Sequence, residues 1–421
     1  MSLILQTIKE LIMGEVLWLN VFLGLVVVGF FVDKLLEFLN VQHWKNEIPD
    51  KLKGFYDQQK YEKSRAYQIE KGKIAFYQSI LSLLITVLAL LLGWLGSLDE
   101  FIGSFVDTPF ARSGFFFIII FFISDFLALP FSIYSVFSIE QRYGFNKTTI
   151  ATFIFDKIKG YLMTLVIGGG LFYFAFFVIA HVSDGYWLWL WIGFSFFMLL
   201  VNMFYADLIL PIFNKLSPLN EGTLKDDIYA FTKKVGYSIK NIYIIDGSKR
   251  STKSNAFFSG LGPRKTIALY DNLIDKHTNQ EIVAILAHEI GHYKRKHILT
   301  SFLLSILQMG ITFYLLELFL FQPNIALALG ANEPSFHIGL IAFGLIFSPF
   351  SLIIGILMNI LSRKNEFEAD AYAKQNYNAR DLSLALKKLS VDSLSNLSPH
   401  KAYVFVHYSH PPLLERLKAL D

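Results

Sequence analysis

The residues best suited to chemistry lie in one short segment, Ala287-His288-Glu289-Ile290-Gly291-His292. On a helix, residues four apart share one face, so His288 and His292 can both reach a single metal ion. Glu289 points about 100° away, where its carboxylate can hold a water molecule on that ion without being a ligand. A motif this short also arises by chance, so the metal-site hypothesis needs a third ligand.

A hydrolytic zinc site commonly uses two histidines and one glutamate and keeps one position open. The acidic segment Asn365-Glu366-Phe367-Glu368-Ala369-Asp370 follows the last apolar run of the chain. We expect Glu366 to be the third ligand, because only Glu366 has a carboxylate partner four residues on. That partner, Asp370, can accept a hydrogen bond from a ligand histidine and fix its tautomer. Glu368 competes for the ligand role, and a solvated helix start is the plain alternative for the segment.

The elements that must position these residues are membrane helices. Hydrophobic residues make up 54% of the 421-residue chain and charged residues only 17%, whereas soluble proteins average about 25% charged residues. The chain has no Cys, which excludes disulfides and thiolate ligands. Seven apolar runs approach or exceed the roughly 20 residues that a spanning helix needs. They are Val16–Val32, Ile74–Leu98, Ser113–Ile139, Gly160–Val182, Gly185–Ala206, Ile298–Leu316 and Ile338–Ser362.

Lysine and arginine are unevenly distributed between the connections of these runs. Residues 33–73, 140–159, 207–297 and 363–421 hold all of them except Lys9 and Arg112. The positive-inside rule places these segments in the cytoplasm and the N-terminus outside. Runs six and seven then cross in opposite directions, which brings His292 and Glu366 together at their cytoplasmic ends. The spread of basic residues favours membrane lipids as partners and gives no support for nucleic acid.

The fold class predicted is an all-α multi-pass membrane protein with a small α+β metalloprotease part on the cytoplasmic side. Residues 1–211 would hold the first five membrane helices, and residues 212–297 a cytoplasmic segment with the HExxH helix. Residues 298–362 would hold helices six and seven, and residues 363–421 the C-terminal helices with the third zinc ligand. Three β-type runs in the second segment predict a small antiparallel sheet, Asn241–Ile245, Ala256–Ser259 and Thr266–Tyr270.

The order of these motifs resembles the CAAX prenyl protease 1 family of integral-membrane zinc endopeptidases. The resemblance rests on HEIGH, EFEAD and the tail motif HYSHPPLLERL at 407–417, and it covers nearly the whole chain. Further matches are Pro130–Tyr134, Ile139–Lys147, Leu210–Lys215 and Ser254–Gly260. The resemblance implies seven helices forming a barrel around a water-filled chamber, with one Zn²⁺ per chain at its cytoplasmic end.

Residue by residue, the resemblance assigns His288, His292 and Glu366 as zinc ligands and Glu289 as the general base. Asn255 and His410 match positions that contact substrate near the scissile bond, and Arg416, which lies in the matching tail motif, is also expected to bind substrate. We expect Asn255 to bind the main chain of a substrate that adds to a sheet edge. We expect His410, held by two following prolines, to donate a hydrogen bond to the oxyanion.

The resemblance implies peptide or protein substrates, which the family cleaves after a prenylated C-terminal Cys or further upstream. Two other interpretations stay open. One is a quality-control zinc protease of the heat-shock type, and the other is a transporter whose HExxH motif is incidental. The compact length favours a bacterial cytoplasmic membrane over the endoplasmic reticulum membrane, with the active site on the cytoplasmic side. The sequence carries no signal for the oligomeric state.

Overall fold

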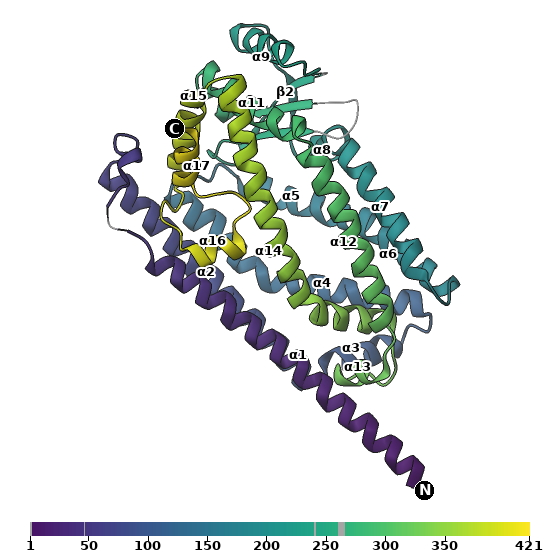
Figure 1. The fold of residues 1–421 in the computed structure, drawn as a ribbon. Helices are drawn as coiled ribbons and strands as arrows, with labels where there is room; N and C mark the ends of the chain where they lie inside the picture. The colour runs from purple at the N-terminus through teal and green to yellow at the C-terminus, as the bar shows by residue number, and fades with distance from the viewer. Residues whose placement is uncertain (1, 46, 240, 260–265) are drawn as a thin grey trace.

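The computed structural model describes residues 2–45, 47–239, 241–259 and 266–421 and is mostly helical (Figure 1). The helices of its first half are α1 (Ser2–Gln42), α2 (Gln58–Leu91), α3 (Trp94–Gly103), α4 (Pro109–Tyr134), α5 (Ile150–Met163), α6 (Gly169–His181), α7 (Tyr186–Phe204) and α8 (Leu210–Phe213). Those of the second half are α9 (Thr223–Lys234), α10 (Asp271–Lys276), α11 (Asn279–Lys294), α12 (His297–Phe319), α13 (Pro323–Ala328), α14 (Phe336–Asn376), α15 (Ala379–Asp392), α16 (Lys401–His407) and α17 (Leu413–Leu420). Short 3-10 or π segments are η1 (Asp50–Leu52), η2 (Ser135–Glu140), η3 (Thr164–Gly168), η4 (Tyr205–Ile209) and η5 (Gly247–Lys249).

Within the described residues, seven helical segments are long and apolar enough to cross a membrane, and they match the seven predicted runs. The π segments η2, η3 and η4 lie within or at the end of the third, fourth and fifth spans without breaking them. The second span ends at Leu91 and not at the predicted Leu98, because Gly93 takes a left-handed conformation (φ 62°) and α3 begins after it. Glycine adopts this conformation at little steric cost, which makes it a common helix terminator.

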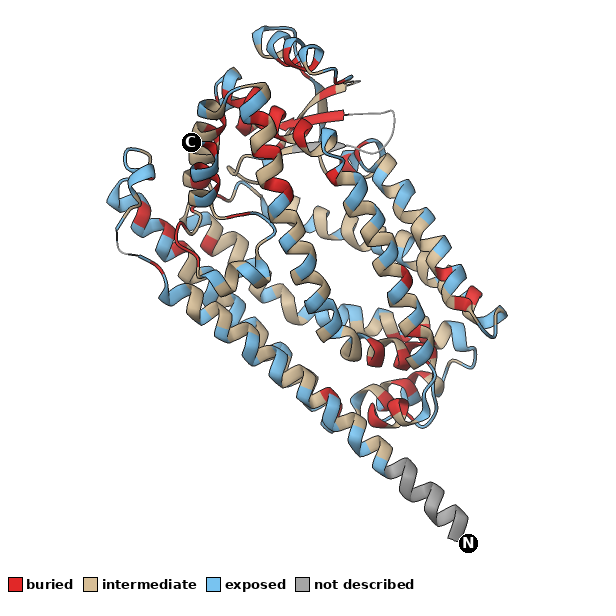
Figure 2. Ribbon diagram, viewed as in Figure 1, coloured by how far each residue is buried: buried red, intermediate tan, exposed pale blue. Residues whose placement is uncertain are grey.

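The seven spans do not pack into a solid bundle. In the most apolar window of each span, only 6–11% of the residues are buried, whereas a helix packed into a core buries one whole face. In Figure 1, α12 and α14 pass in front of α4 and α5, and the start of α14 contacts α4 through the hydrogen bond between Ser113 and His337. Buried residues gather at the two ends of the spanning helices, around α11 at one end and around α13 at the other (Figure 2). This arrangement confirms a barrel of seven helices.

A four-stranded sheet lies beside α11, with strands β1 (Leu216–Pro218), β2 (Asn241–Ile245), β3 (Ala256–Ser259) and β4 (Thr266–Tyr270) in the order β1-β2-β4-β3. Three strands coincide with the predicted runs. The prediction of an antiparallel sheet is wrong for β2 and β4, which pair in parallel from Asn241 opposite Thr266. After β2 the chain first forms β3 at the edge of the sheet. It then reverses and forms β4 between β2 and β3, antiparallel to β3, so β4 runs in the same direction as β2. Alternating patterns within a strand carry no information on this order.

Helices α11 and α14 cross closely and so join distant parts of the sequence. Thr278 and Glu281 form a capping box that starts α11, and most of its residues are buried. An added Cβ on Gly291 would lie 3.0 Å from the Cα of Ala369 in α14, so glycine permits this approach. Helix α14 continues unbroken from the seventh span through Asp370, and the predicted boundary at residues 362 and 363 therefore lies inside one helix. The four-part division of the chain stays a prediction.

Candidate metal centre and active site

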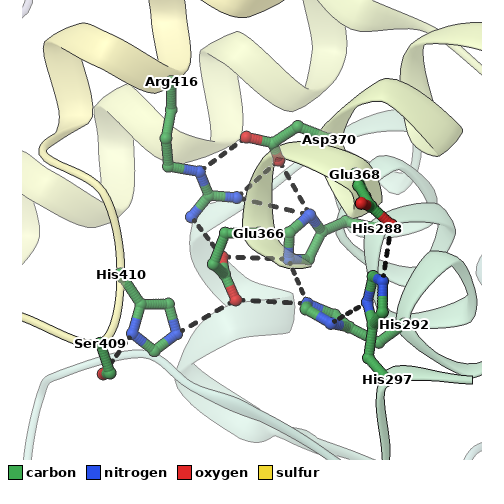
Figure 3. Close-up of polar contacts among 9 residues, drawn as sticks. All are labelled: His288, His292, His297, Glu366, Glu368, Asp370, Ser409, His410 and Arg416. Atoms are coloured by element: carbon green, nitrogen blue, oxygen red, sulfur yellow. Dashed lines mark hydrogen bonds and ion pairs between the residues drawn. The ribbon is translucent and has the colours of Figure 1, made fainter. Parts of the chain in front are cut away.

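The crossing of α11 and α14 brings together the three residues expected to bind metal (Figure 3). One ligand atom from each of His288, His292 and Glu366 lies within 4.8 Å of the others. The Nε2 atoms of the two histidines are 3.2 Å apart. The Glu366 carboxylate oxygens lie 3.4 Å from Nε2 of His288 and 3.2 Å from Nε2 of His292. Two imidazoles and one carboxylate are a common donor set for catalytic zinc.

The charges around these three residues also favour a cation. Burial alone would lower the pKa of His288, but hydrogen bonds from its ring to Asp370 and Glu366 outweigh burial and raise that pKa to about 9. The negative charge of these two carboxylates also stabilises any other positive charge placed beside them. Oε2 of Glu366 is fully buried and lies 3.4 Å from Nε2 of His288 and 3.2 Å from a guanidinium nitrogen of Arg416, so the carboxylate faces the ring nitrogen that would share a metal ion with it. The site therefore fits a divalent metal ion.

The Asp370 carboxylate contacts the His288 ring nitrogen that is not expected to bind metal, and the Arg416 guanidinium binds that carboxylate. Nδ1 of His288 lies 2.8 Å from Oδ1 of Asp370, the contact predicted for this aspartate. Arg416 of α17 donates to both oxygens of Asp370, at 2.8 and 2.6 Å, and its third nitrogen lies 3.2 Å from Oε2 of Glu366. Arg416 is only 8% exposed and Asp370 only 1%. These buried contacts orient two of the expected ligands, whereas contact between Arg416 and substrate stays a prediction.

His292 has a different support, which sequence reasoning missed. Its Nδ1 lies 3.1 Å from Nδ1 of His297, and Nε2 of His297 lies 3.1 Å from Oε2 of Glu368. Glu368 therefore serves His297 and is not a metal ligand in this geometry. A spacing of five residues does not place two side chains on one helical face. Lys296 takes a left-handed conformation (φ 61°) between α11 and α12, and this break turns His297 back toward His292.

The remaining predicted site residues lie at different distances from the metal site. Glu289 is partly exposed on a helix whose neighbouring residues are buried. Two-thirds of the His410 side chain is exposed, and its Nε2 lies 3.4 Å from Oε1 of Glu366. Asn255 is exposed directly before β3, where its side chain accepts a hydrogen bond from the amide of Ala256. No contact recorded within the described residues joins Asn255 to the three expected ligands.

Comparison with known proteins identifies the group to which this arrangement belongs. Residues 37–215 match the family described as CAAX prenyl protease N-terminal, five membrane helices, and residues 218–421 match peptidase family M48. A CAAX prenyl protease 1 homolog of Arabidopsis thaliana is 34% identical over 94% of this chain and 96% of the relative. The homolog of Homo sapiens is 31% identical over 89% of this chain and 88% of the relative. The chain belongs to the CAAX prenyl protease 1 family.

A solved structure supports the same assignment at the level of the fold. The crystal structure of Ste24p from S. mikatae superposes with a TM-score of 0.91, at 29% identity, over 96% of this chain and 99% of that one. The superposition therefore covers nearly the whole of both chains. As a member of the CAAX prenyl protease 1 family, the chain is a multi-pass membrane metalloendopeptidase. The interpretation as a transporter with an incidental HExxH motif is therefore set aside.

Proposed function

We propose that this protein is a zinc-dependent endopeptidase that removes the C-terminal tripeptide of prenylated proteins at a CAAX sequence. The observation that carries the proposal is the convergence of His288, His292 and Glu366 beside the partly exposed Glu289. The CAAX substrate class is supported by relatives named CAAX prenyl protease 1 homolog, which align over nearly their full length. Seven helices long and apolar enough to cross a membrane also support a membrane-anchored substrate.

His288, His292 and Glu366 would hold one zinc ion. When bound, zinc supplies a Lewis acid that polarises the scissile carbonyl and makes water a better nucleophile near neutral pH. Glu289 takes the proton from the attacking water and later delivers it to the leaving amine. Asp370 holds His288, and His297, itself bound to Glu368, holds His292. Each imidazole is thereby kept in the tautomer that leaves its Nε2 unprotonated.

The substrate main chain is proposed to add to the free edge of β3. Strand β4 is paired on both sides, so it cannot accept another strand, whereas among the described residues β3 pairs with β4 alone. Strand addition binds backbone atoms and therefore tolerates varied side chains, as a protease with several substrates requires. Asn255 lies directly before this edge and would bond to the substrate main chain.

His410 is proposed to donate a hydrogen bond to the oxyanion of the tetrahedral intermediate. We expect His410→Ala to lower kcat at least about tenfold, with zinc content and melting temperature nearly unchanged. Steady-state kinetics, metal analysis and thermal unfolding of the purified variant measure the three quantities. An early melting transition with zinc loss, in a variant whose remaining molecules cleave at the normal rate, would show that His410 only packs the tail.

His297 is proposed to orient His292 through the hydrogen bond between their Nδ1 atoms. We expect His297→Phe to weaken zinc affinity about 10- to 100-fold, the usual effect of removing such a partner. Competition with a chromogenic chelator measures the affinity directly. Glu368→Gln keeps an acceptor for His297 and should have a smaller effect. Unchanged zinc affinity in His297→Phe would show that His297 does not orient His292 for metal binding.

The N-terminus is proposed to lie outside the cytoplasm and the C-terminus, with the active site, inside. The support is the clustering of lysine and arginine in alternate connections. Reporter fusions before Met1 and after Asp421 test this orientation, and a C-terminal reporter active only outside the cytoplasm would overturn it. A bacterial cytoplasmic membrane stays a prediction, because the relatives compared above are eukaryotic.

Cleavage by the purified protein tests the proposed function. A farnesylated CAAX peptide and an unprenylated, misfolded membrane protein are offered separately, each with and without a chelator. We expect chelator-sensitive release of the tripeptide from the farnesylated peptide at a much higher rate. Cleavage of the membrane protein alone would instead favour the quality-control alternative.

A further inference from the structure

A cavity of about 930 Å³ adjoins the metal site on the side of the C-terminal segment. Its wall includes parts of α1, α2, α15 and α16 and the loop at 408–412. His410 and Arg416 belong to the same wall, and both contact the Glu366 carboxylate. Helix α16 packs against α1 and α14 (Figure 1). A ligand in the cavity would therefore lie next to the reacting bond of a bound substrate.

The charged side chains of this wall are mostly cationic. Lysine and arginine contribute five of them, Lys34, Arg65, Lys71, Lys73 and Arg416, against the single carboxylate of Glu37. That carboxylate is already bound by Lys34, whose Nζ lies 2.7 Å from it. Arg416 is likewise engaged by Asp370 and Glu366. The wall thus carries more positive charge than its own carboxylate neutralises.

Lys71 and Lys73 of α2 account for much of this excess. Both are exposed, and among the residues that the structure describes neither forms an ion pair with a carboxylate. The Nζ of Lys71 lies 5.3 Å from the centre of the Tyr67 ring. Apolar side chains line the same cavity, among them Ile69 and Phe76. This combination suits a short peptide with apolar side chains and one free carboxylate.

The start of β3 lies beside this part of α2. Nζ of Lys253 donates to the hydroxyl of Tyr67 at 2.8 Å, and Lys253 precedes Asn255 by two residues. A substrate strand that pairs antiparallel with β3 runs toward the beginning of β3. The C-terminal end of that strand consequently points toward Tyr67 and Lys71. Three extended residues beyond the scissile bond span about 10 Å.

We propose that Lys71 and Lys73 bind the free C-terminal carboxylate of the peptide substrate. The inference rests on the proposed function and adds a reason for the position of cleavage. A carboxylate held at this distance sets how many residues extend past the reacting bond. The enzyme then selects substrates that end shortly after that bond, and an internal peptide bond of the same sequence is a poorer substrate.

Two farnesylated CAAX peptides test this inference, one with a free C-terminal acid and one with a C-terminal carboxamide. We expect kcat/KM to fall about tenfold or more on amidation, the scale of losing a charge-assisted hydrogen bond. Lys71→Gln/Lys73→Gln should lower kcat/KM for the acid by a similar factor and leave the amide nearly unchanged. Lys63→Gln, an exposed position of α2 outside the cavity, serves as the matched control and should change neither.

The possible outcomes separate this inference from the proposed function. Equal cleavage of acid and amide by the unmodified enzyme overturns the carboxylate site and leaves the peptidase intact. An equal loss for both peptides in the double variant also overturns it, as does a loss seen only in bilayers with anionic lipid, because the lysines would then bind headgroups. Failure to cleave either peptide, with zinc bound and the protein folded, overturns the proposed function and the inference with it.

Discussion

Replacing Glu289 by Gln is expected to leave about one zinc ion per chain in place and to lower peptide cleavage at least about 10²-fold. Glu289 is one residue after His288, on a different face of α11, and is partly exposed. The amide cannot take the proton from the attacking water, whereas the metal keeps all three of its protein ligands. Zinc content and single-turnover cleavage of a farnesylated peptide measure the two effects on one sample.

Glu366→Gln is the matched variant for this experiment. It also exchanges a carboxylate for an amide, but at the position that faces both histidines. We expect most of the zinc to be lost, because the metal then has only two strong ligands. Equal loss of zinc from Glu289→Gln and Glu366→Gln would contradict the assignment of base and ligand.

Arg416→Met is expected to destabilise the protein by about 3–5 kcal/mol, the usual cost of removing one partner of a buried ion pair. The variant leaves the carboxylates of Asp370 and Glu366 buried without their cation. The melting temperature in detergent should fall by several degrees. The fall should be larger in chelator, because zinc can still compensate the charge of Glu366.

Lys418→Met provides the control for this prediction. Lys418 is on the same short helix, α17, but its side chain is exposed. Its replacement removes one positive charge without stranding a buried carboxylate. If Arg416→Met melts at the temperature of Lys418→Met, the buried contacts of Arg416 do not stabilise the C-terminal segment.

Much of the site follows from periodicity and chain direction. Residues four apart on a helix place His288 and His292 together, and two antiparallel spans bring Glu366 to them from 74 residues away. The choice of Glu366 over Glu368 follows from the same spacing, because Asp370 lies one turn after Glu366. Figure 3 shows both consequences in the structure.

Other features depend on backbone geometry and pairing that residue types do not carry. The left-handed conformation of Lys296, a residue that rarely adopts it, turns His297 toward His292. The parallel pairing of β2 and β4 depends on strand order, which no local pattern specifies. Arg416 reaches Asp370 across 46 residues, and the family resemblance alone singled it out, as a substrate contact. These features required the three-dimensional arrangement.

Anomalous X-ray diffraction from crystals of the purified protein, on both sides of the zinc absorption edge, tests the central claim most directly. We expect one strong peak per chain, present only above the edge, among His288 Nε2, His292 Nε2 and the carboxylate of Glu366. A fully occupied zinc peak at any other group of residues, with none among these three, would contradict it.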